Sequence, residues 1–322
     1  MRRIVTDEQR RSRPEAGLPF GAGRFRADSS SLVAHVPKGT PRSSLLESAA
    51  KSPGQNRTYG PVATHVSRLE RCFDELRSRR KKALIGYLTA GFPSWAGFGR
   101  AFEDLEKGGA DVIEIGVPFS DPIADGPTIQ YSSLKALKGG VTLKGILAWV
   151  AKRRKKSATP IVLMSYLNPI LRLGLERFAK EASRAGVDGL IVPDTIPEET
   201  GALRESLTSA GLDLIHLVAP TTPPARRKWV ASRSRGFLYA VSVAGVTGAR
   251  KSLPPEAISF LRTLKGSRVP VAVGFGISGP KQAKAVAPYV DGVIVGSALI
   301  TRLREKKPLL PFVRSLRRAL DK

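Results

Sequence analysis

The chain has 322 residues, of which 42% are hydrophobic, and it carries a formal net charge of +26 at pH 7. This length suits one large domain or two small ones, and no apolar run approaches the ~20 residues that a membrane-spanning helix needs. The single cysteine, Cys72, rules out an intramolecular disulfide framework, and no apolar segment of a signal peptide follows the basic start. These totals exclude membrane proteins and disulfide-rich secreted proteins, and they favour a globular protein of the cytoplasm.

The positive charge is spread along the chain. Residues 1–65 contain 11 Lys and Arg and 5 Asp and Glu, which leaves 42 and 22 for the remainder. The basic runs RSRRKK (77–82), KRRKK (152–156) and RRK (226–228) fall in predicted helices or at their ends, without a nucleic-acid-binding motif. We interpret them as solvated helix faces, and a nucleic-acid-binding surface is the alternative.

Residues 1–65 are rich in Arg, Ser, Gly and Pro and show no sustained helical or strand period. We therefore expect a disordered basic extension. A transit peptide is a weaker alternative because this segment contains acidic residues. A mis-called start, with the true start near Val62 or Val66, is a third possibility.

From Ser67 onward the pattern changes to an ordered domain, which we place at residues 66–322. The stretch SRLERCFDELRSRRKK predicts a charged amphipathic helix. After it, eight short β-rich runs alternate with helix-like segments. The runs are 83–90, 111–117, 160–166, 188–194, 213–219, 236–243, 269–275 and 291–297.

Eight successive βα units predict an α/β fold of the (β/α)₈, or TIM-barrel, type, with an N-terminal helix before the first strand. A doubly wound open sheet is the alternative. That fold usually carries a glycine-rich dinucleotide fingerprint after its first strand, and TAGFPSWAG (89–97) is not one.

The second strand carries the most informative charge. Active sites of such barrels lie at the carboxyl ends of the strands, which places GVPFSDPIADGP (116–127) at the mouth. Strand alternation puts Val112, Glu114 and Gly116 on one face. If that face points inward, burial raises the pKa of Glu114 and suits it to proton transfer, whereas the alternative is a structural glutamate paired with a buried Arg or hydroxyl. Asp125 follows on a loop that can fold over the mouth.

Glycines follow the last three predicted strands. They occur in AGVTGAR (244–250), GFGIS (274–278) and VGSA (295–298). Loops after the seventh and eighth strands of many barrels bind phosphate, because glycine lets backbone N–H groups approach the oxygens closely. A small phosphorylated substrate is therefore expected.

Two absences narrow the chemistry. No lysine lies within the eight predicted strands, which leaves a Schiff-base lysine without a position. The histidines His35, His65 and His216 are scattered, so we expect no metal site, and His216 fits a core or strand-end position better than a catalytic one. Acid/base catalysis by carboxylates, without a cofactor, remains.

The segment IEIGVPFSDPIADGPTIQ (113–130) closely resembles the signature of the tryptophan synthase alpha chain family. The resemblance continues, in order, through YLTAGFP (87–93), LMSYLNPI (163–170), GLIVPDTIPEE (189–199), VSVAGVTGAR (241–250), GFGIS and GSA. It covers nearly all of residues 66–322, whereas residues 1–65 have no counterpart. Leu167 and Val243 occupy positions where relatives vary.

The resemblance implies cleavage of indole-3-glycerol phosphate to indole and glyceraldehyde 3-phosphate. In that reading Glu114 is the catalytic acid/base, and Asp125 binds the indole N–H. The other implied positions are Gly248, Gly276, Gly296 and Ser297 for the phosphate, Tyr87, Thr89, Tyr166, Leu217 and Tyr239 for the indole pocket, and Thr247 for closure of a loop over the second-strand loop.

The implied partner is a tryptophan synthase beta chain in an α₂β₂ complex, with pyridoxal phosphate expected only on the beta chain. Two alternatives stay open. One is another phosphate-binding barrel enzyme, such as an indole-glycerol-phosphate synthase, which typically needs a lysine at a strand end. The other is an inactive relative that binds nucleic acid, against which the intact Glu114 and Asp125 speak.

Overall fold

The structure is a computed structural model of the chain and describes residues 66–241, 255–274 and 276–321. The predicted disordered extension, residues 1–65, falls outside the described residues. The strands are β1 (Ala83–Thr89), β2 (Val112–Gly116), β3 (Ile161–Met164), β4 (Gly189–Ile191), β5 (Asp213–Ile215), β6 (Leu217–Val218), β7 (Leu238–Val241), β8 (Val271–Gly274) and β9 (Gly292–Val295). All eight predicted runs contain strand structure, with shorter bounds than predicted.

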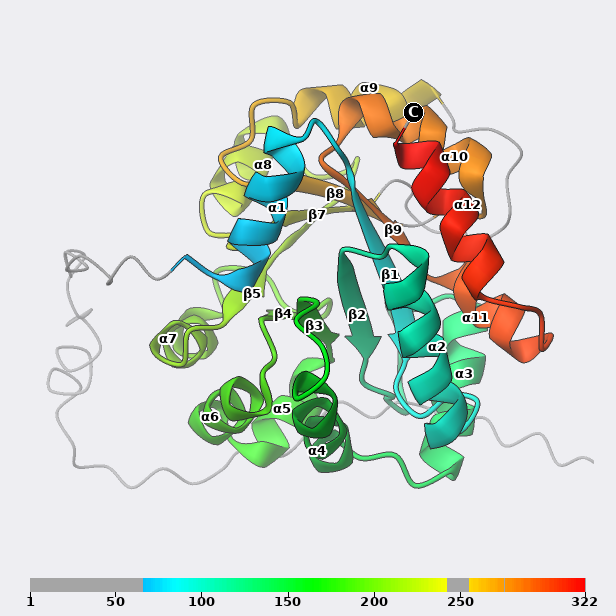
Figure 1. Cartoon of the computed structure of the whole chain (residues 1–322). Helices are drawn as coiled ribbons and strands as arrows, with labels where there is room; N and C mark the ends of the chain where they lie inside the picture. The colour runs from blue at the N-terminus through cyan, green and yellow to red at the C-terminus, as the bar shows by residue number, and fades with distance from the viewer. Residues whose placement is uncertain (1–65, 242–254, 275, 322) are drawn as a thin grey trace, which may run out of the picture. The chain divides into compact units, whose positions relative to one another are not determined.

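Helices alternate with these strands along the chain (Figure 1). They are α1 (Arg68–Ser78), α2 (Trp95–Gly108), α3 (Pro127–Lys138), α4 (Leu143–Arg154), α5 (Leu167–Leu173), α6 (Leu175–Ala185), α7 (Gly201–Ser209), α8 (Pro224–Ala231), α9 (Pro255–Thr263), α10 (Pro280–Val286), α11 (Ser297–Arg304) and α12 (Leu310–Leu320), with a short 3₁₀ helix at Ala287–Tyr289.

The strands form a parallel wall in the order β5-β4-β3-β2-β1-β9-β8-β7-β6. β5 and β6 are two parts of the fifth predicted strand, separated only by His216. β5 pairs with β4 and β6 pairs with β7, and the carbonyl of His216 accepts the backbone N–H of Tyr239 at 3.0 Å. The chain itself therefore joins the two ends of the wall and closes it into the predicted (β/α)₈ barrel.

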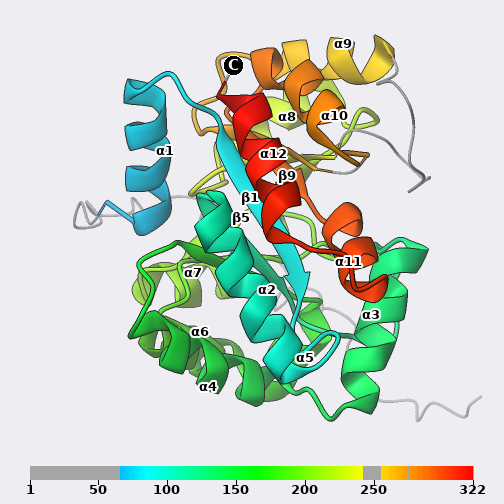
Figure 2. The same ribbon diagram turned by 45° about the vertical axis from the view of Figure 1, so that its right-hand side comes forward.

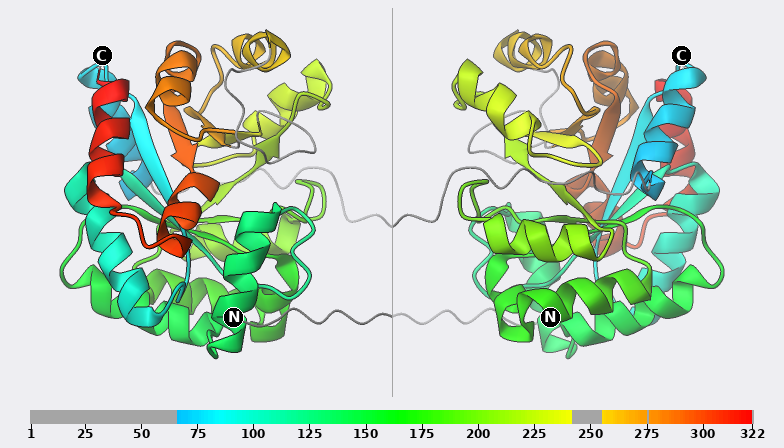
Figure 3. Two further views of the ribbon diagram at one scale, coloured as in Figure 1. Left: turned by 90° about the vertical axis from the view of Figure 1, so that its right-hand side faces the viewer. Right: turned by 90° about the vertical axis from the view of Figure 1, so that its left-hand side faces the viewer.

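Two apolar cores follow from strand alternation. Ile113 and Ile115 of β2 point outward and pack with the surrounding helices, whereas Val112 belongs to the core inside the barrel. The side views in Figure 3 show the helices outside the strands. In Figure 2, α2 and α12 run beside each other over β1, and both contact it. The predicted inward face of β2 is thus confirmed for Val112, and Glu114 shares that face.

Helix α1 covers the end of the barrel where the strands begin. Its N-terminus forms a capping box, in which Ser67 accepts the backbone N–H of Glu70 and the Glu70 carboxylate accepts that of Ser67. Leu69 and Phe73 are buried, and the ring of Phe73 lies 5.7 Å from that of Phe237. The amphipathic pattern of residues 67–82 is explained by this apolar face.

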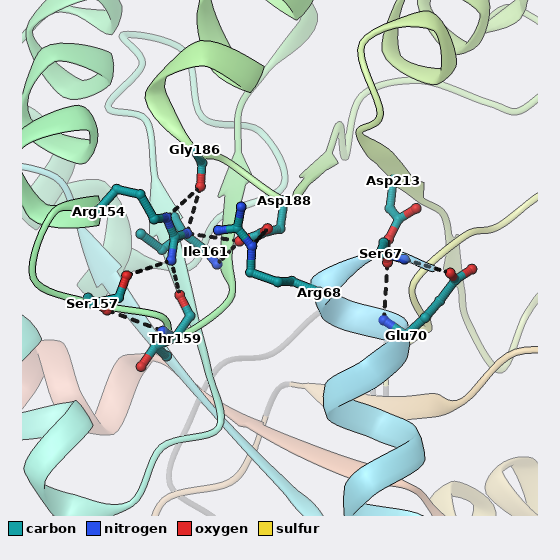
Figure 4. Close-up of polar contacts among 10 residues, drawn as sticks. All are labelled: Ser67, Arg68, Glu70, Arg154, Ser157, Thr159, Ile161, Gly186, Asp188 and Asp213. Atoms are coloured by element: carbon teal, nitrogen blue, oxygen red, sulfur yellow. Dashed lines mark hydrogen bonds and ion pairs between the residues drawn. The ribbon is translucent and has the colours of Figure 1, made fainter. Parts of the chain in front are cut away.

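Aspartates at the starts of strands bind α1 to the barrel (Figure 4). The Ser67 hydroxyl donates to Asp213 at 2.6 Å. Asp188 accepts the backbone N–H of Ile161 at 2.8 Å and forms ion pairs with Arg154 at 2.9 Å and Arg68 at 3.0 Å. These buried carboxylates therefore have donors from neighbouring strands and from the helix.

Within the part of the chain that the structure describes, no helix is both long enough and apolar enough to cross a membrane.

Candidate active site

A cavity of about 360 Å³ opens at the carboxyl ends of the strands. It brings together residues that are far apart in the sequence. Seven of the predicted site residues line it: Tyr87, Glu114, Asp125, Tyr239, Gly276, Gly296 and Ser297.

Glu114 lies in the wall of this cavity, on β2, opposite Tyr87 of β1 in the strand register. It is 1% exposed, and its Oε2 atom has no hydrogen-bond partner among the described residues. Burial, and then the nearby charge of Asp125, raise the pKa of Glu114 to about 8. Glu114 therefore holds a proton at neutral pH, which it can donate into the cavity.

Asp125 reaches the same cavity from the loop between β2 and α3. Burial raises its pKa to about 6, and a hydrogen bond from the Tyr166 hydroxyl at 3.2 Å opposes that rise. The Tyr166 oxygen accepts the backbone N–H of Ala124 at 2.9 Å, and its ring stacks on Phe119 at 4.9 Å. Tyr166 thus holds both the loop and the carboxylate.

Two glycines make room for the tyrosines of the cavity. A Cβ atom on Gly116 would lie 2.0 Å from the Tyr87 hydroxyl, and one on Gly274 would lie 2.2 Å from the Tyr239 hydroxyl. Such distances are well inside van der Waals contact. The absence of side chains at these two strand ends lets both phenol rings lie in the barrel interior.

The expected phosphate position is built on α11. Gly296 is the N-cap of this helix, and the first helical residues, Ser297 and Ala298, also line the cavity. Their backbone N–H groups have no acceptor within the helix, so a helix start of this kind attracts anions. Gly276 lines the same region with a φ of +78°, which glycine adopts without strain.

The remaining predicted site residues lie elsewhere. Thr89 is buried, and its hydroxyl is 2.6 Å from that of Ser132 on α3. Leu217 packs against the core inside the barrel. Tyr166 contacts Asp125 from outside the cavity lining. Thr247 and Gly248 fall outside the described residues.

The cavity also contains residues that sequence reasoning missed. They are Thr128, Ile129, Met164, Ile277, Ser278, Ile294, Ala298, Thr301, Arg302, Glu305, Lys307 and Phe312. Strand alternation was a usable signal for two of them, because Met164 and Ile294 lie on the inward faces of β3 and β9. The remainder lie on the loop after β8, on α3, α11 and α12, and on the turn after α11, and they depend on how these segments pack.

His216 lies away from this cavity. It is buried, and burial, followed by the charges of Arg204 and Arg233, lowers its pKa to about 4. Its Nε2 atom has no hydrogen-bond partner among the described residues. A neutral imidazole in the barrel wall agrees with the expected core position. No group of three or more His, Cys, Asp or Glu within the described ranges is placed to hold a metal ion.

The fold and the cavity define a (β/α)₈-barrel protein with two carboxylates and the start of a helix at its mouth. The model of the family "Tryptophan synthase alpha chain" matches residues 73–311. The chain therefore belongs to the tryptophan synthase alpha chain family. Its members are carbon–carbon lyases that act on indole-3-glycerol phosphate in tryptophan biosynthesis.

Individual relatives agree with this assignment. The alpha chain of Geobacter sp. (strain M21) is 49% identical over 236 residues, which are 73% of this chain and 88% of the relative. That of Geobacter sulfurreducens is 46% identical over 262 residues, which are 79% of this chain and 99% of the relative. A structure of Mycobacterium tuberculosis tryptophan synthase is 42% identical with a TM-score of 0.74, covering 80% of this chain and all of that chain. The structure of the alpha subunit from Legionella pneumophila str. Paris is 37% identical with a TM-score of 0.73, and the match covers 80% of this chain and 99% of that chain.

Proposed function

We propose that Glu114 and Asp125 are the acid/base pair that cleaves indole-3-glycerol phosphate. The observation that carries the proposal is a buried glutamate with a raised pKa, facing the same cavity as a second carboxylate that ionises more readily. Two carboxylates whose environments separate their pKa values divide the roles of acid and base between them.

In this proposal Glu114 protonates the indole ring, so that the ring can leave as neutral indole. An indole carbanion is a poor leaving group, so the ring must gain a proton at C3 before the C–C bond breaks. The resulting cation accepts the electron pair of that bond, and the glycerol hydroxyl loses its proton as the aldehyde forms. Glu114 can donate the first proton and take the second, and general acid/base steps of this kind typically accelerate a reaction by ~10²–10⁴.

Asp125 stabilises the charge that grows on the ring. With its lower pKa it carries a negative charge over much of the neutral range, and it can accept the indole N–H. A partly buried carboxylate that is held beside the ring stabilises a developing cation. In the same proposal, Gly276, Gly296 and Ser297 bind the phosphate, with Gly248 as a further contact, and Thr247 closes a loop over the site.

The partner is a beta chain in an α₂β₂ complex that receives the indole. One feature of this chain supports such an interface. Large apolar side chains are exposed on the segments that follow β2, β3 and β4 in the chain. They are Ile123, Tyr131, Leu134, Leu171 and Ile196. Contiguous exposed apolar surface marks protein interfaces, and we propose that these side chains form part of the surface that the beta chain covers. We also propose that the complex is cytoplasmic.

The test is a single-turnover cleavage assay on saturating indole-3-glycerol phosphate, with folding checked by circular dichroism. Glu114→Gln should lower the rate by at least ~10²-fold while substrate still binds, because an amide is neither an acid nor a base near neutral pH. Asp125→Asn should also lower it strongly, because an amide is uncharged. Asp121→Asn is the matched control, since Asp121 is exposed and contacts only its neighbour Ser120 through its side chain in the described structure. Near-normal turnover by Glu114→Gln would refute the mechanism.

Adding a beta chain tests the partner separately. Binding of the beta chain should raise the cleavage rate of the wild-type chain. Charged substitutions at Ile123 and Leu134 should weaken that stimulation without changing the rate of the isolated chain. A stimulation that survives both substitutions would place the interface elsewhere.

A further inference from the structure

The opposite end of the barrel carries a second, smaller hollow. It has a volume of about 230 Å³ and lies where α1 ends and where β1 and β9 begin. It is lined by Phe73, Leu76, Arg77, Arg80, Lys81, Lys82 and Asp291. Four cations thus surround one carboxylate above an apolar floor of Phe73 and Leu76. In Figure 2 this region is the turn between α1 and β1.

The single carboxylate of the hollow is already engaged in the fold. Asp291 accepts the backbone N–H of Val271 at 2.9 Å through its side chain and that of Ala83 at 2.8 Å through its carbonyl. The Lys81 ammonium lies 3.5 Å from Asp321, and Arg77 lies 3.6 Å from Asp74. Within the described part of the chain, the side chains of Arg80 and Lys82 form no hydrogen bond or ion pair. The hollow therefore has an excess of positive charge and two cations available to a ligand.

The backbone at Arg80 is the second observation. Arg80 has a φ of +54°, in the left-handed region where helices usually place glycine. Its N–H bonds to the carbonyl of Arg77 and that of Lys81 bonds to Leu76, which is the hydrogen-bond pattern of a Schellman motif. An arginine in this conformation is strained, and strained residues cluster at functional sites.

The end of α11 has the same construction. Lys306 also has a φ of +54°, and the N–H of the next residue, Lys307, bonds back to Arg302. That turn directs Lys307 into the wall of the candidate active site, where an anionic substrate is expected. Among the described residues with a side chain, only Arg80 and Lys306 have a positive φ. In both turns a basic residue occupies the position of glycine, and the following lysine lines a cavity.

We propose that the hollow formed by residues Phe73, Leu76, Arg77, Arg80, Lys81, Lys82 and Asp291 binds a small phosphate monoester. Guanidinium and ammonium groups match the charge and the several acceptor oxygens of a phosphate. The apolar floor fits a short carbon body rather than a bare ion. The volume is below the range of about 300–1,000 Å³ for drug-sized ligands, which favours a small molecule over a nucleic acid. This site is independent of the cleavage reaction.

The test is calorimetric titration of the full chain with phenyl phosphate at fixed ionic strength. The protein carries Gly296→Val, which weakens binding at the phosphate position of the candidate active site and so separates it from binding in the hollow. We expect one saturable site, with weaker binding of inorganic phosphate and of phenol. Adding Arg80→Gly and Lys82→Ala should weaken the binding of phenyl phosphate by at least about tenfold. Arg80→Gly removes a backbone strain, so the melting temperature should not fall, and lost binding will not reflect unfolding.

Two matched controls make the result specific. Lys306→Gly makes the same backbone change at the other turn, and Lys155→Ala with Lys156→Ala removes two charges from exposed positions of the α4 terminus. Both should leave the affinity within about twofold. The proposal is overturned if phenyl phosphate shows no saturable binding. It is also overturned if replacing Lys155 and Lys156 by Ala weakens phenyl phosphate binding as much as replacing Arg80 and Lys82 does. Tighter binding of a single-stranded oligonucleotide, lost in the Arg80 and Lys82 variant, would also overturn it.

Discussion

The Tyr166 hydroxyl lies 3.2 Å from Oδ2 of Asp125 and accepts the backbone N–H of Ala124 at 2.9 Å, so one phenol oxygen holds a carboxylate and its loop together. Because this hydrogen bond lowers the pKa of Asp125, Tyr166→Phe should raise it and delay ionisation as the pH increases. We expect a lower kcat at pH 6.5 that recovers at higher pH, with little change in the melting temperature. Tyr131→Phe is the control, since Tyr131 contacts Phe92, Lys135 and Arg304 through its ring, which the substitution keeps. An unchanged pH profile in Tyr166→Phe would contradict this role.

The two carboxylates predict a bell-shaped pH profile of kcat/KM. Activity should rise as Asp125 ionises near its pKa of about 6 and fall as Glu114 loses its proton near its pKa of about 8. These values belong to the pair, because the charge of Asp125 acts on Glu114.

The same pKa shift should appear in the stability. A carboxyl whose pKa is raised on folding stabilises the protein below the unfolded pKa, and this stabilisation is lost as the pH rises through the folded value. The melting temperature of the wild type should therefore fall between about pH 5 and pH 8 more steeply than that of Glu114→Gln. Parallel curves for the two proteins would show that Glu114 ionises normally in the folded state.

Substitution at the proposed phosphate position should affect substrate binding more than the loss of dispersed surface charge. A Cβ atom at Gly296 would meet Tyr87 at an ordinary 3.5 Å, so there is room for a side chain at this position. Gly296→Val should still raise KM, by about tenfold or more, because its branched side chain obstructs the approach of phosphate to the start of α11. Neutralising Lys155 and Lys156 together should change only the salt dependence of kcat/KM. The reverse ranking in steady-state kinetics would reject the assignment.

The contact between Ser67 and Asp213 predicts a pH-dependent anchor for α1 (Figure 4). Burial raises the pKa of Asp213 to about 6, and the Ser67 hydroxyl opposes that rise. Ser67→Ala removes a helix cap and a donor to a buried carboxylate, which together cost about 1–3 kcal/mol. The loss in urea denaturation should be larger at pH 8, where Asp213 is ionised, than at pH 5. Ser78→Ala, at the exposed end of the same helix, should cost much less.

Local patterns were enough to predict the barrel and its central carboxylates. Short apolar runs separated by helical segments fix the eight βα units, and a period of two fixes the side of β2 on which Glu114 lies. The rule that barrel sites follow the strands then places Asp125 at the same mouth. The glycine-rich strand ends also pointed to Gly276 and Gly296, which the structure places in the wall of the same cavity; their binding of phosphate stays a prediction.

Other features depend on packing that no local pattern specifies. Tyr166 meets Asp125 across 41 residues of sequence, and only the path of the β2–α3 loop makes that contact. Thr89 was expected in the indole pocket, but the position of α3 turns its hydroxyl toward Ser132. The change of strand partner at His216 has no sequence signal either, because the run 213–219 is apolar on both sides of it.

The paired glycines and tyrosines of the barrel interior restrict which side-chain sizes can occur together at these positions. Tyr87 and Gly116 share one volume, and Tyr239 and Gly274 share another. A side chain at either glycine is compatible with the fold only when the facing tyrosine becomes much smaller. Across related sequences, positions 87 and 116 should therefore covary in size, as should 239 and 274. Enlargement of the substrate cavity by design must change both members of a pair together.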